Sequence, residues 1–246
     1  MLAENLGEEP YASILCYPKL TEATLHARIT ELKNHGVRAV EFAGRTSIFN
    51  MPVLGKGFVG IVVIAHMGRE RVALKIRRMD ADRQGLLPEA ELLAKANSAG
   101  VGPKLISVST NFLLMQLVEG ELLPAWLETN KEKTVVRNVL TELLEQCRRL
   151  DTVGLDHGEL SHAPKHVIVD GQTPFIVDFE TASINRKPAN VTAICQYLFM
   201  NSGAVAKMVA EVFGERNRER IVEALRGYKR CRTRRDFELV LKSCLS

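Results

Sequence analysis

The sequence predicts an α+β protein in two parts, a strand-rich front half and a helical back half. Runs of β-branched residues interrupted by glycine fill positions 37–77, a pattern that is typical of an antiparallel sheet. Further along, apolar residues recur at helical spacing, most strongly over 135–150. We therefore expect an N-terminal part over residues 1–118 and a C-terminal part over residues 119–246.

The individual elements carry local signals of their own. Thr21 precedes a helical pattern that ends at His35-Gly36, and Pro88 stands near the start of a second helix over 88–97. From residue 191 onward the pattern predicts three or four helices and no strand. The expected strands cover 39–42, 57–68, 71–76, 104–109 and 112–118, and a hairpin joins 167–169 to 175–177 around Asp170-Gly171.

The composition excludes several classes of protein. Of the 246 residues, 46% are apolar and 25% are charged, which suits a folded chain and not a disordered or fibrous one. The longest apolar stretch, 58–65, is far shorter than the roughly 20 residues of a bilayer span, and the acidic N-terminus lacks the features of a secretion signal. The cysteines are widely spaced and form no Cys-x-x-Cys pair. We expect free thiols, no membrane association and a cytoplasmic location.

Positive charge is concentrated toward the C-terminal end of the sequence. The net charge is only +4, yet ten basic residues lie between Arg216 and Lys242. Clustered lysine and arginine side chains neutralise phosphates, which makes this segment a candidate contact for RNA or a ribonucleoprotein. Basic helices are as often simple solvated faces, and only Tyr228 and Phe237 offer aromatic rings for stacking. The sequence leaves both interpretations open.

A glycine-rich segment provides the first chemical signal. Gly55, Gly57 and Gly60, followed by Val62, match the pattern G-x-G-x-x-G-x-V. Glycine lets backbone N–H groups approach phosphate oxygens because no Cβ stands in the way. The segment lies between expected strands, and the second of these strands ends in Lys75, whereas a dinucleotide-binding fold requires a helix at this point. The pattern therefore favours a phosphate-binding loop within a sheet.

Further motifs follow in order along the chain. They read V-A-L-K at 72–75, P-E-A-E-L-L at 88–93, H-G-E-L-S at 157–161 and V-D-F-E at 177–180. Together with the glycine-rich loop, this order resembles that of the protein kinases. It is most similar to the atypical RIO-type and KEOPS-associated kinases and to small archaeal chains that are predicted serine/threonine kinases. The resemblance spans about residues 50–185.

The resemblance implies a bilobal protein-kinase-like fold. Its N-terminal lobe would begin with an extension over residues 1–48, and residues 49–118 would form the antiparallel sheet and one helix. Its C-terminal lobe would be trimmed and mainly helical. ATP would bind between the lobes, with Lys75 held by a helical glutamate. Only one of Glu89 and Glu91 can face the lysine. The resemblance favours Glu89, because the E-A-x-L-L pattern of the small archaeal kinases matches residues 89–93. The residues implied for ATP binding are Gly55, Lys56, Gly57, Gly60, Val62, Ala73, Lys75, Glu89, Met115, Gln116 and Leu117.

The resemblance also implies roles in the second half of the chain. Asp178 would bind a Mg²⁺ ion that bridges the nucleotide phosphates, with Mn²⁺ as the alternative because His166 stands where related kinases have a metal-binding asparagine. Glu159 stands in the place of the catalytic aspartate and would position or deprotonate the acceptor. Lys165 would stabilise charge on the transferring phosphate, and Glu180 replaces the glycine of D-F-G.

The expected function is therefore that of an atypical ATP-dependent serine/threonine protein kinase, which transfers the γ-phosphoryl group to a protein hydroxyl, its own included. Two alternatives stay open. Glu159, His166 and Glu180 favour a pseudokinase, which would be a nucleotide-binding scaffold in an RNA- or ribosome-linked complex. A small-molecule phosphotransferase would share the lobes and the catalytic loop.

Overall fold

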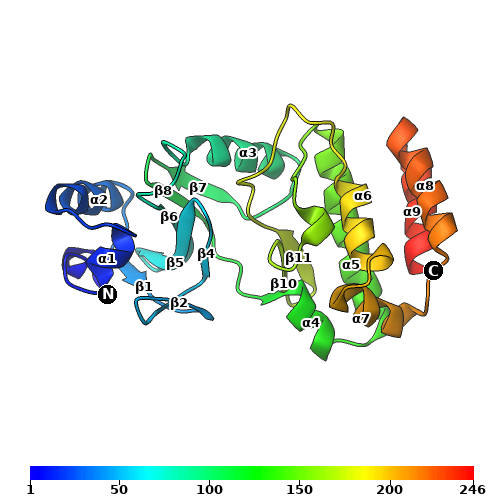
Figure 1. Cartoon of the computed structure of the whole chain (residues 1–246), viewed down its shortest axis with the longest axis horizontal. Helices are drawn as coiled ribbons and strands as arrows, with labels where there is room; N and C mark the ends of the chain where they lie inside the picture. Colours follow the sequence, from blue (N-terminus) through cyan, green and yellow to red (C-terminus); the bar gives the residue numbers. More distant parts are fainter. The chain divides into compact units, whose positions relative to one another are not determined.

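Residues 1–246 are all described by the structure, a computed structural model of an α+β protein with antiparallel sheets and several helices (Figure 1). The chain divides into two compact units. Unit 1 comprises Met1–Ala94 and Lys104–Leu117, and unit 2 comprises Lys95–Pro103 and Val118–Ser246. The chain passes from unit 1 to unit 2 for the last time after Leu117, whereas the sequence placed this boundary after residue 118. Residues 95–103 were expected in the front half and belong instead to unit 2, where Arg149 donates a hydrogen bond to the carbonyl of Gly100.

Unit 1 is built on an antiparallel sheet. Its strands, with those of a separate small hairpin, are β1 (Ala39–Glu41), β2 (Thr46–Ile48), β3 (Met51–Val53), β4 (Gly55–Lys56), β5 (Gly60–Met67), β6 (Glu70–Arg77), β7 (Leu105–Val108) and β8 (Phe112–Gln116). The strand order is β1-β5-β6-β8-β7, and β4 pairs with β5, while β2 and β3 form the hairpin. Strands β5 and β6 pair along their whole length, so the β-branched runs in the sequence become the centre of the sheet.

Helices cover both faces of this sheet. They are α1 (Tyr11–Leu15), α2 (Glu22–Asn34) and the first part of α3 (Leu87–Ser98). The helices α1 and α2 lie together on one face (Figure 1), where they bury the odd-numbered positions 61–65 of β5 and the even-numbered positions 72–76 of β6. On the other face, Leu86 and Ala90 at α3 pack against Val59 and Leu113. Since side chains alternate along a strand, Lys75 faces α3.

The N-terminal segment 1–48 is part of the core of unit 1. Arg28 is 2% exposed, and it donates hydrogen bonds to the carbonyl of Leu15 and, over 3.0 Å, to Oδ1 of Asn111. Glu31 accepts hydrogen bonds from Ser109 and from the backbone and side chain of Asn111. Burial alone would raise the pKa of Glu31, but these hydrogen bonds lower it. The segment expected as an extension is therefore fixed to the sheet by buried polar contacts.

Unit 2 combines a small sheet with helices. Its elements are β9 (Glu121–Leu122), β10 (Val167–Asp170), β11 (Thr173–Ile176), α4 (Leu123–Thr129), α5 (Lys133–Thr152), α6 (Asn190–Cys195), α7 (Ala204–Phe213), α8 (Arg218–Cys231) and α9 (Arg234–Leu245). The sheet has the order β11-β10-β9. Helix α5 buries the stripe of apolar residues that the sequence predicts. None of the helices is both long enough and apolar enough to span a bilayer.

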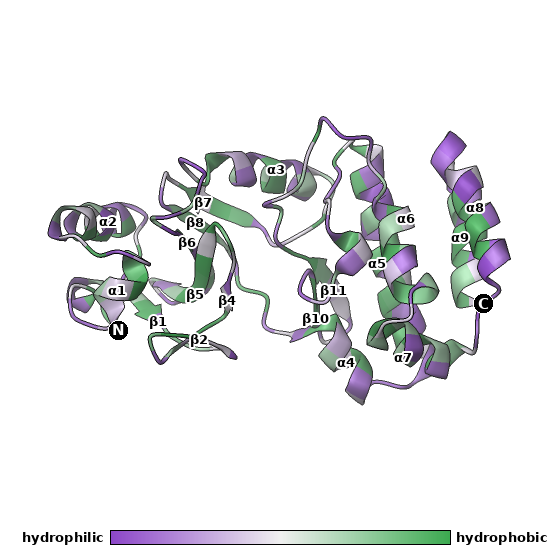
Figure 2. Ribbon diagram, in the orientation of Figure 1, coloured by the Kyte–Doolittle hydropathy of each residue, from purple (hydrophilic) through white to green (hydrophobic).

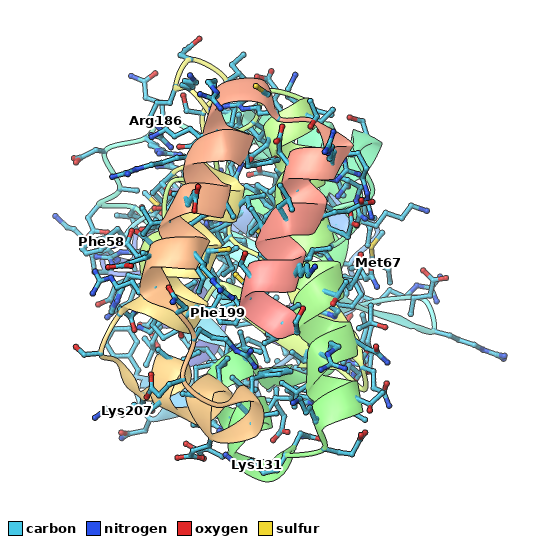
Figure 3. The ribbon with its side chains drawn as sticks, turned by 90° about the vertical axis from the view of Figure 1, so that its right-hand side faces the viewer. Phe58, Met67, Lys131, Arg186, Phe199 and Lys207 are labelled. Atoms are coloured by element: carbon cyan, nitrogen blue, oxygen red, sulfur yellow. The ribbon has the colours of Figure 1, made fainter.

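Helices α5, α8 and α9 pack side by side within unit 2. Figure 3 shows α9 between α8 and α5, and Tyr228 of α8 contacts Phe237 of α9 with their ring centroids 5.9 Å apart. Figure 2 shows hydrophilic and hydrophobic residues alternating along α8 and α9, as expected for helices that bury a single stripe. The basic segment of the sequence is therefore a helical pair with one buried side.

Most expected elements are confirmed, but some were missed and one turn was wrong. Thr21 caps α2 by accepting a hydrogen bond from the backbone of Thr24. The sequence did not predict α1, α4, β9 or the β2–β3 hairpin, because these elements are too short to show a hydrophobic period. The β10–β11 hairpin was expected to turn at Asp170-Gly171. Asp170 instead pairs with Thr173, so the turn residues are Gly171 and Gln172.

Candidate functional site

Several residues that the sequence singled out in unit 1 share one face of the sheet. In the β5–β6 register Val62 lies opposite Lys75, and in the β6–β8 register Ala73 lies opposite Met115. Cross-strand partners project to the same face, as do residues two apart along a strand. Gly60, two residues before Val62, therefore belongs to this face as well. It is the face that α3 covers.

Lys75 and Glu89 form a buried ion pair on this face. The Nζ atom of Lys75 lies 2.8 Å from each carboxylate oxygen of Glu89, and both side chains are 5% exposed. Glu91, two residues further along α3, is exposed. The structure thus pairs Lys75 with the glutamate that the sequence favoured. A buried ion pair of this kind is costly to desolvate and is weak evidence for a purely stabilising role.

Gly60 leaves the space that the Lys75 side chain occupies. A Cβ atom on residue 60 would lie 2.8 Å from Cγ and 3.0 Å from Cε of Lys75, and 3.0 Å from the carbonyl oxygen of Ile76. A Cβ atom on Gly55, in the same glycine-rich segment, would have no neighbour within 4 Å. The two glycines therefore have different roles, and only Gly60 is needed for the position of the lysine.

Replacing Gly60 by alanine should lower the free energy of unfolding by about 1–3 kcal/mol, because the added methyl group overlaps the lysine stem and a backbone carbonyl. The matched Gly55→Ala variant should stay within about 0.5 kcal/mol of the wild type. Urea unfolding followed by far-UV circular dichroism measures both. Equal stability of the two variants would contradict the close packing of Gly60 against Lys75.

The glycine-rich segment forms a tight hairpin between β4 and β5. The backbone N–H of Gly57 donates to the carbonyl of Gly60 over 2.8 Å, and Phe58 at the tip is 90% exposed. Lys56 donates a hydrogen bond to the hydroxyl of Tyr17 over 2.7 Å. The segment therefore connects two strands, as expected, and its polar backbone stays near the surface.

The remaining residues implied for ATP binding lie at the end of β8. Gln116 pairs with Val72 and so projects from the opposite face to Met115. Its side-chain Oε1 accepts a hydrogen bond from the backbone of Lys104 over 3.2 Å. Leu117 is half-buried and is the last residue of unit 1. A role for Gln116 and Leu117 through their backbone groups, which is what the resemblance implies, is independent of these side-chain positions.

Unit 2 brings three possible metal ligands together. Val167 opens β10 and pairs with Ile176 near the end of β11, and the backbone N–H of Val177 donates to the carbonyl of His166 over 2.9 Å. An antiparallel hairpin places the residue before its first strand beside the residue after its second strand. The two ends of the hairpin therefore carry His166 and, one residue beyond Val177, Asp178.

Glu159 reaches the same place from the loop that follows α5. Its Oε2 atom lies 3.5 Å from Nε2 of His166, while Oδ2 of Asp178 lies 3.9 Å from Nδ1 of His166. One ligand atom from each of the three residues lies within 4.8 Å of the others. The His166 side chain is 14% exposed, and those of Glu159 and Asp178 are 40% and 42% exposed. The two carboxylates are therefore accessible to solvent, whereas the imidazole is mostly buried.

Asp178 has an uncommon backbone conformation. Its φ angle is +68°, in the left-handed region that glycine adopts freely and other residues rarely do. Aspartate tolerates this region better than most residues, at a cost of order 1 kcal/mol. Such outliers occur preferentially at functional sites, where the surrounding structure holds a side chain in a required direction. The strain therefore supports a role for the Asp178 carboxylate.

His157 supports the backbone next to Asp178. It is fully buried, and its Nε2–H donates to the carbonyl of Val177 over 3.1 Å. Burial lowers the pKa of His157 to about 4, and the nearby His166 contributes in the same direction, so the ring is neutral at ordinary pH. Its ring contacts those of Phe179 and His166, with centroids 5.1 and 5.4 Å away. His157 thus acts as a positioning residue for the segment that carries Asp178.

Gly158 is required between His157 and Glu159. Its φ angle is +93°, and a Cβ atom there would lie 2.5 Å from Nη2 of Arg186 and 3.1 Å from the carbonyl oxygen of Thr181. The end of the Arg186 side chain could move aside, but any other residue would be strained at this φ and would press on the Thr181 carbonyl. The glycine of the H-G-E-L-S motif therefore fixes the direction in which the chain enters Glu159.

A buried polar network holds this loop to the helices of unit 2. Oδ1 of Asn190 accepts a hydrogen bond from the backbone of His157, and Nδ2 of Asn190 donates to Asp151 over 2.8 Å. Asp151 also accepts from the hydroxyl of Tyr228 over 3.1 Å. Burial raises the pKa of Asp151, although the hydrogen bonds from Asn190, Val191 and Tyr228 oppose that shift. The network links α5, α6 and α8 to the loop.

Removing the hydroxyl of Tyr228 should lower the free energy of unfolding by about 1–2 kcal/mol, because Asp151 loses a hydrogen bond inside the protein. Tyr197 provides the matched control, since its buried hydroxyl has no hydrogen-bond partner. We expect Tyr197→Phe to be neutral or stabilising. Thermal unfolding of Tyr228→Phe and Tyr197→Phe makes the comparison. A Tyr228→Phe variant as stable as the wild type would show that the network contributes nothing to stability.

The sequence did not single out Asp151 or Asn190, and it offered Tyr228 only as an aromatic ring for stacking. One signal was available for Asp151, which lies four residues after Cys147 on the buried stripe of α5, where a charged residue is unusual. Lys165, expected near the transferring phosphate, is exposed in the loop before His166. Lys165 therefore presents its ammonium group to solvent.

The two units differ in what they offer chemically. Unit 1 presents a lysine ammonium, fixed by a carboxylate, on the same face as the start of a glycine-rich hairpin, which is a cationic group suited to anionic oxygens. Unit 2 presents two carboxylates and an imidazole within 4.8 Å of one another, which are ligand types that divalent cations accept. Comparison of the chain with known protein families and with curated proteins finds no match.

Proposed function

We propose that the protein is an ATP-dependent phosphotransferase that acts on a protein hydroxyl. The buried Lys75–Glu89 pair carries the proposal. Two charged groups in the core of a unit cost free energy of desolvation, and the sequence places them on the face where Gly60 makes room for the lysine. A requirement to hold a cation toward the phosphates of a nucleotide explains the pair better than stability does. The resemblance to atypical protein kinases points the same way.

In this proposal unit 1 binds the nucleotide. Lys75 contacts phosphate oxygens, Glu89 holds its ammonium group, and the backbone N–H groups of the hairpin at 55–60 approach the phosphates. Val62, Ala73 and Met115 lie on the same face as Lys75, where they would contact the adenosine.

Unit 2 supplies the groups for the transfer. Asp178 holds a divalent cation, which when bound neutralises the charge on the phosphate oxygens. One oxygen of Glu159 faces His166, and the other can accept a hydrogen bond from the acceptor hydroxyl. In the transfer, the bond from the γ-phosphorus to its bridging oxygen breaks and a bond to the acceptor oxygen forms. ADP leaves, and the hydroxyl proton passes to Glu159 or to water.

The test is incubation of the full chain with γ-labelled ATP and either Mg²⁺ or Mn²⁺, with its own hydroxyls, added proteins and small alcohols as acceptors. Label should enter protein with the wild type and with Asp170→Ala, which removes an exposed carboxylate at the end of β10, and not with Asp178→Ala. Absence of transfer with either metal would overturn the enzymatic proposal. Retained ATP binding in that case would favour the nucleotide-binding scaffold.

A contact with RNA is a second candidate, and the surface of α8 and α9 favours it. Of the ten basic residues between positions 216 and 242, Arg216, Arg232 and Arg234 donate to groups within unit 2, and the other seven are exposed. Exposed arginines that neutralise phosphates give an affinity that falls steeply with salt. Binding of single-stranded RNA should weaken in Arg226→Glu and Arg230→Glu but not in Arg69→Glu, an exposed site in unit 1.

A further inference from the structure

We propose that Arg78 and Tyr17 are positioning residues, which hold the glycine-rich hairpin over residues 55–60 in the conformation that admits phosphate oxygens. The inference rests on the proposed function, because it concerns the phosphates of the nucleotide that unit 1 would bind. It gives a role in nucleotide binding to Tyr17, which belongs to the N-terminal segment outside the resemblance to kinases. All of these residues lie in unit 1.

Three carbonyl oxygens of the hairpin are hydrogen-bonded within unit 1. The oxygen of Gly57 accepts from Nη1 of Arg78 over 2.9 Å, and the oxygen of Val59 accepts from the backbone N–H of Arg78 over 2.8 Å. The oxygen of Gly60 accepts from the N–H of Gly57 over 2.8 Å. A carbonyl oxygen carries partial negative charge, so each oxygen that is fixed in this way is kept from facing a phosphate. Arg78 accounts for two of the three.

The guanidinium group of Arg78 is itself fixed by Asp80. Its Nε and Nη2 atoms donate to the two carboxylate oxygens of Asp80 over 2.9 and 2.6 Å, while Nη1 donates to Gly57. This two-point pairing sets the plane of the guanidinium group, which the single ammonium of a lysine cannot reproduce. All three nitrogen atoms have acceptors, and the positive charge is balanced by Asp80. Arg78 therefore acts through the backbone of the hairpin.

Tyr17 contacts both of the cationic side chains at the hairpin. The centre of its ring lies 4.5 Å from Nζ of Lys56 and 5.2 Å from Cζ of Arg78, distances that are typical of cation–π contacts. Its hydroxyl accepts the hydrogen bond from Lys56, and its carbonyl accepts from the backbone N–H of Met79 over 2.7 Å. One aromatic residue thus connects Lys56 of β4 to the segment that follows β6.

A strained residue beside Tyr17 gives independent support. Phe49 and Asn50 join β2 to β3, and both have positive φ angles, +49° for Phe49 and +61° for Asn50. Asparagine and glycine are the usual residues in such a turn, and a phenylalanine there is a genuine outlier. The Phe49 side chain is 51% exposed, so its own burial does not explain the strain. Its ring lies 5.6 Å from that of Tyr17, where it limits the movement of Tyr17.

The arrangement separates two parts of nucleotide binding. The hairpin would meet the phosphates, whereas the adenosine would contact the sheet face that carries Val62 and Met115. A hairpin that is no longer fixed should therefore weaken the binding of ATP and leave the binding of adenosine unchanged. A residue that served stability alone would change the affinity for both ligands or for neither.

The experiment compares Arg78→Lys with Arg71→Lys in the full chain. Arg78→Lys keeps the charge but loses the two-point pairing, so ATP should bind about tenfold more weakly. Arg71 is paired with Glu41 near the start of β6, and its replacement should leave ATP affinity unchanged. Isothermal titration calorimetry measures ATP binding, and saturation-transfer nuclear magnetic resonance measures adenosine binding. Far-UV circular dichroism verifies that each variant is folded.

A second pair of variants tests Tyr17. Tyr17→Phe removes the hydroxyl that accepts from Lys56, and ATP should bind about threefold more weakly. The matched Tyr11→Phe variant changes a tyrosine that contacts Phe42, and it should bind ATP as the wild type does. Neither variant should alter the affinity for adenosine.

Failure of this inference can be told apart from failure of the proposed function. Wild-type ATP affinity in Arg78→Lys or in Tyr17→Phe overturns the inference even if phosphoryl transfer is found, and so does an equal loss of ATP and adenosine binding. A loss that is confined to ATP supports the inference even if no transfer is detected. If the wild type binds neither ligand, the inference fails together with nucleotide binding itself.

Discussion

Replacing Lys75 by methionine should abolish ATP binding and also lower the free energy of unfolding by about 3–5 kcal/mol. Both effects have the same origin, because Lys75 and Glu89 are buried together with their charged atoms 2.8 Å apart. Methionine preserves most of the volume of the lysine stem but removes the ammonium group. The Glu89 carboxylate would then lack the lysine that compensates its burial. Isothermal titration calorimetry with ATP and urea unfolding measure the two effects.

The double variant Lys75→Met/Glu89→Leu separates function from stability. Replacing a buried ion pair by apolar side chains of similar size is often neutral or stabilising, so unfolding should return close to the wild-type value. ATP binding and phosphoryl transfer should stay absent, because the cation is still missing. A double variant that is stable and still binds ATP would show that the pair does not contact the nucleotide. A double variant as unstable as the single one would contradict the description of the pair as a cost to folding.

Much of unit 1 could be predicted because its signals are local. The nearly continuous burial of the middle of β5 and β6 appears in the sequence as β-branched runs, and Thr21 and Pro88 mark the starts of two helices. Helix geometry indicates that only one of Glu89 and Glu91 can pair with Lys75, and the resemblance was needed to choose Glu89, which the structure pairs with the lysine. The sequence could not show why residue 60 has to be glycine, because its close contact with Lys75 depends on how β5 and β6 pair.

The metal cluster was predictable only in part. Asp178 and His166 were identified by their place in motifs, and the hairpin between them could have been used to infer that they meet, because its two ends lie side by side. The distance of Glu159 from His166 could not be inferred, since residues 160–165 between them form a loop with a single 3₁₀ turn and no hydrophobic period. The network of Asp151, Asn190 and Tyr228 joins three helices far apart in the sequence, and no local pattern reports such contacts.

Substitution of Asp178 is expected to separate backbone strain from chemistry. Asp178→Gly and Asp178→Ala both remove the carboxylate, and each should reduce phosphoryl transfer by at least about 100-fold, since a group that stabilises charge in the transition state is lost. Alanine is usually the more stabilising of the two residues, but here the glycine variant should have the higher free energy of unfolding. Glycine adopts a φ of +68° without strain, whereas alanine at this angle costs about 1–2 kcal/mol.

Asp178→Gly should therefore be more stable than Asp178→Ala by about 1 kcal/mol, because comparing the two variants cancels the loss of the carboxylate's own contacts. Asp178→Asn completes the series, since asparagine tolerates the left-handed region but carries no charge. Unfolding by urea gives the order of stability, and labelled ATP gives the activity. If Asp178→Asn transfers phosphate as the wild type does, the negative charge at this position is not needed for the transfer. If Asp178→Ala is the more stable of the first pair, the left-handed conformation is not retained in solution, and the argument that strain marks a functional residue is lost with it.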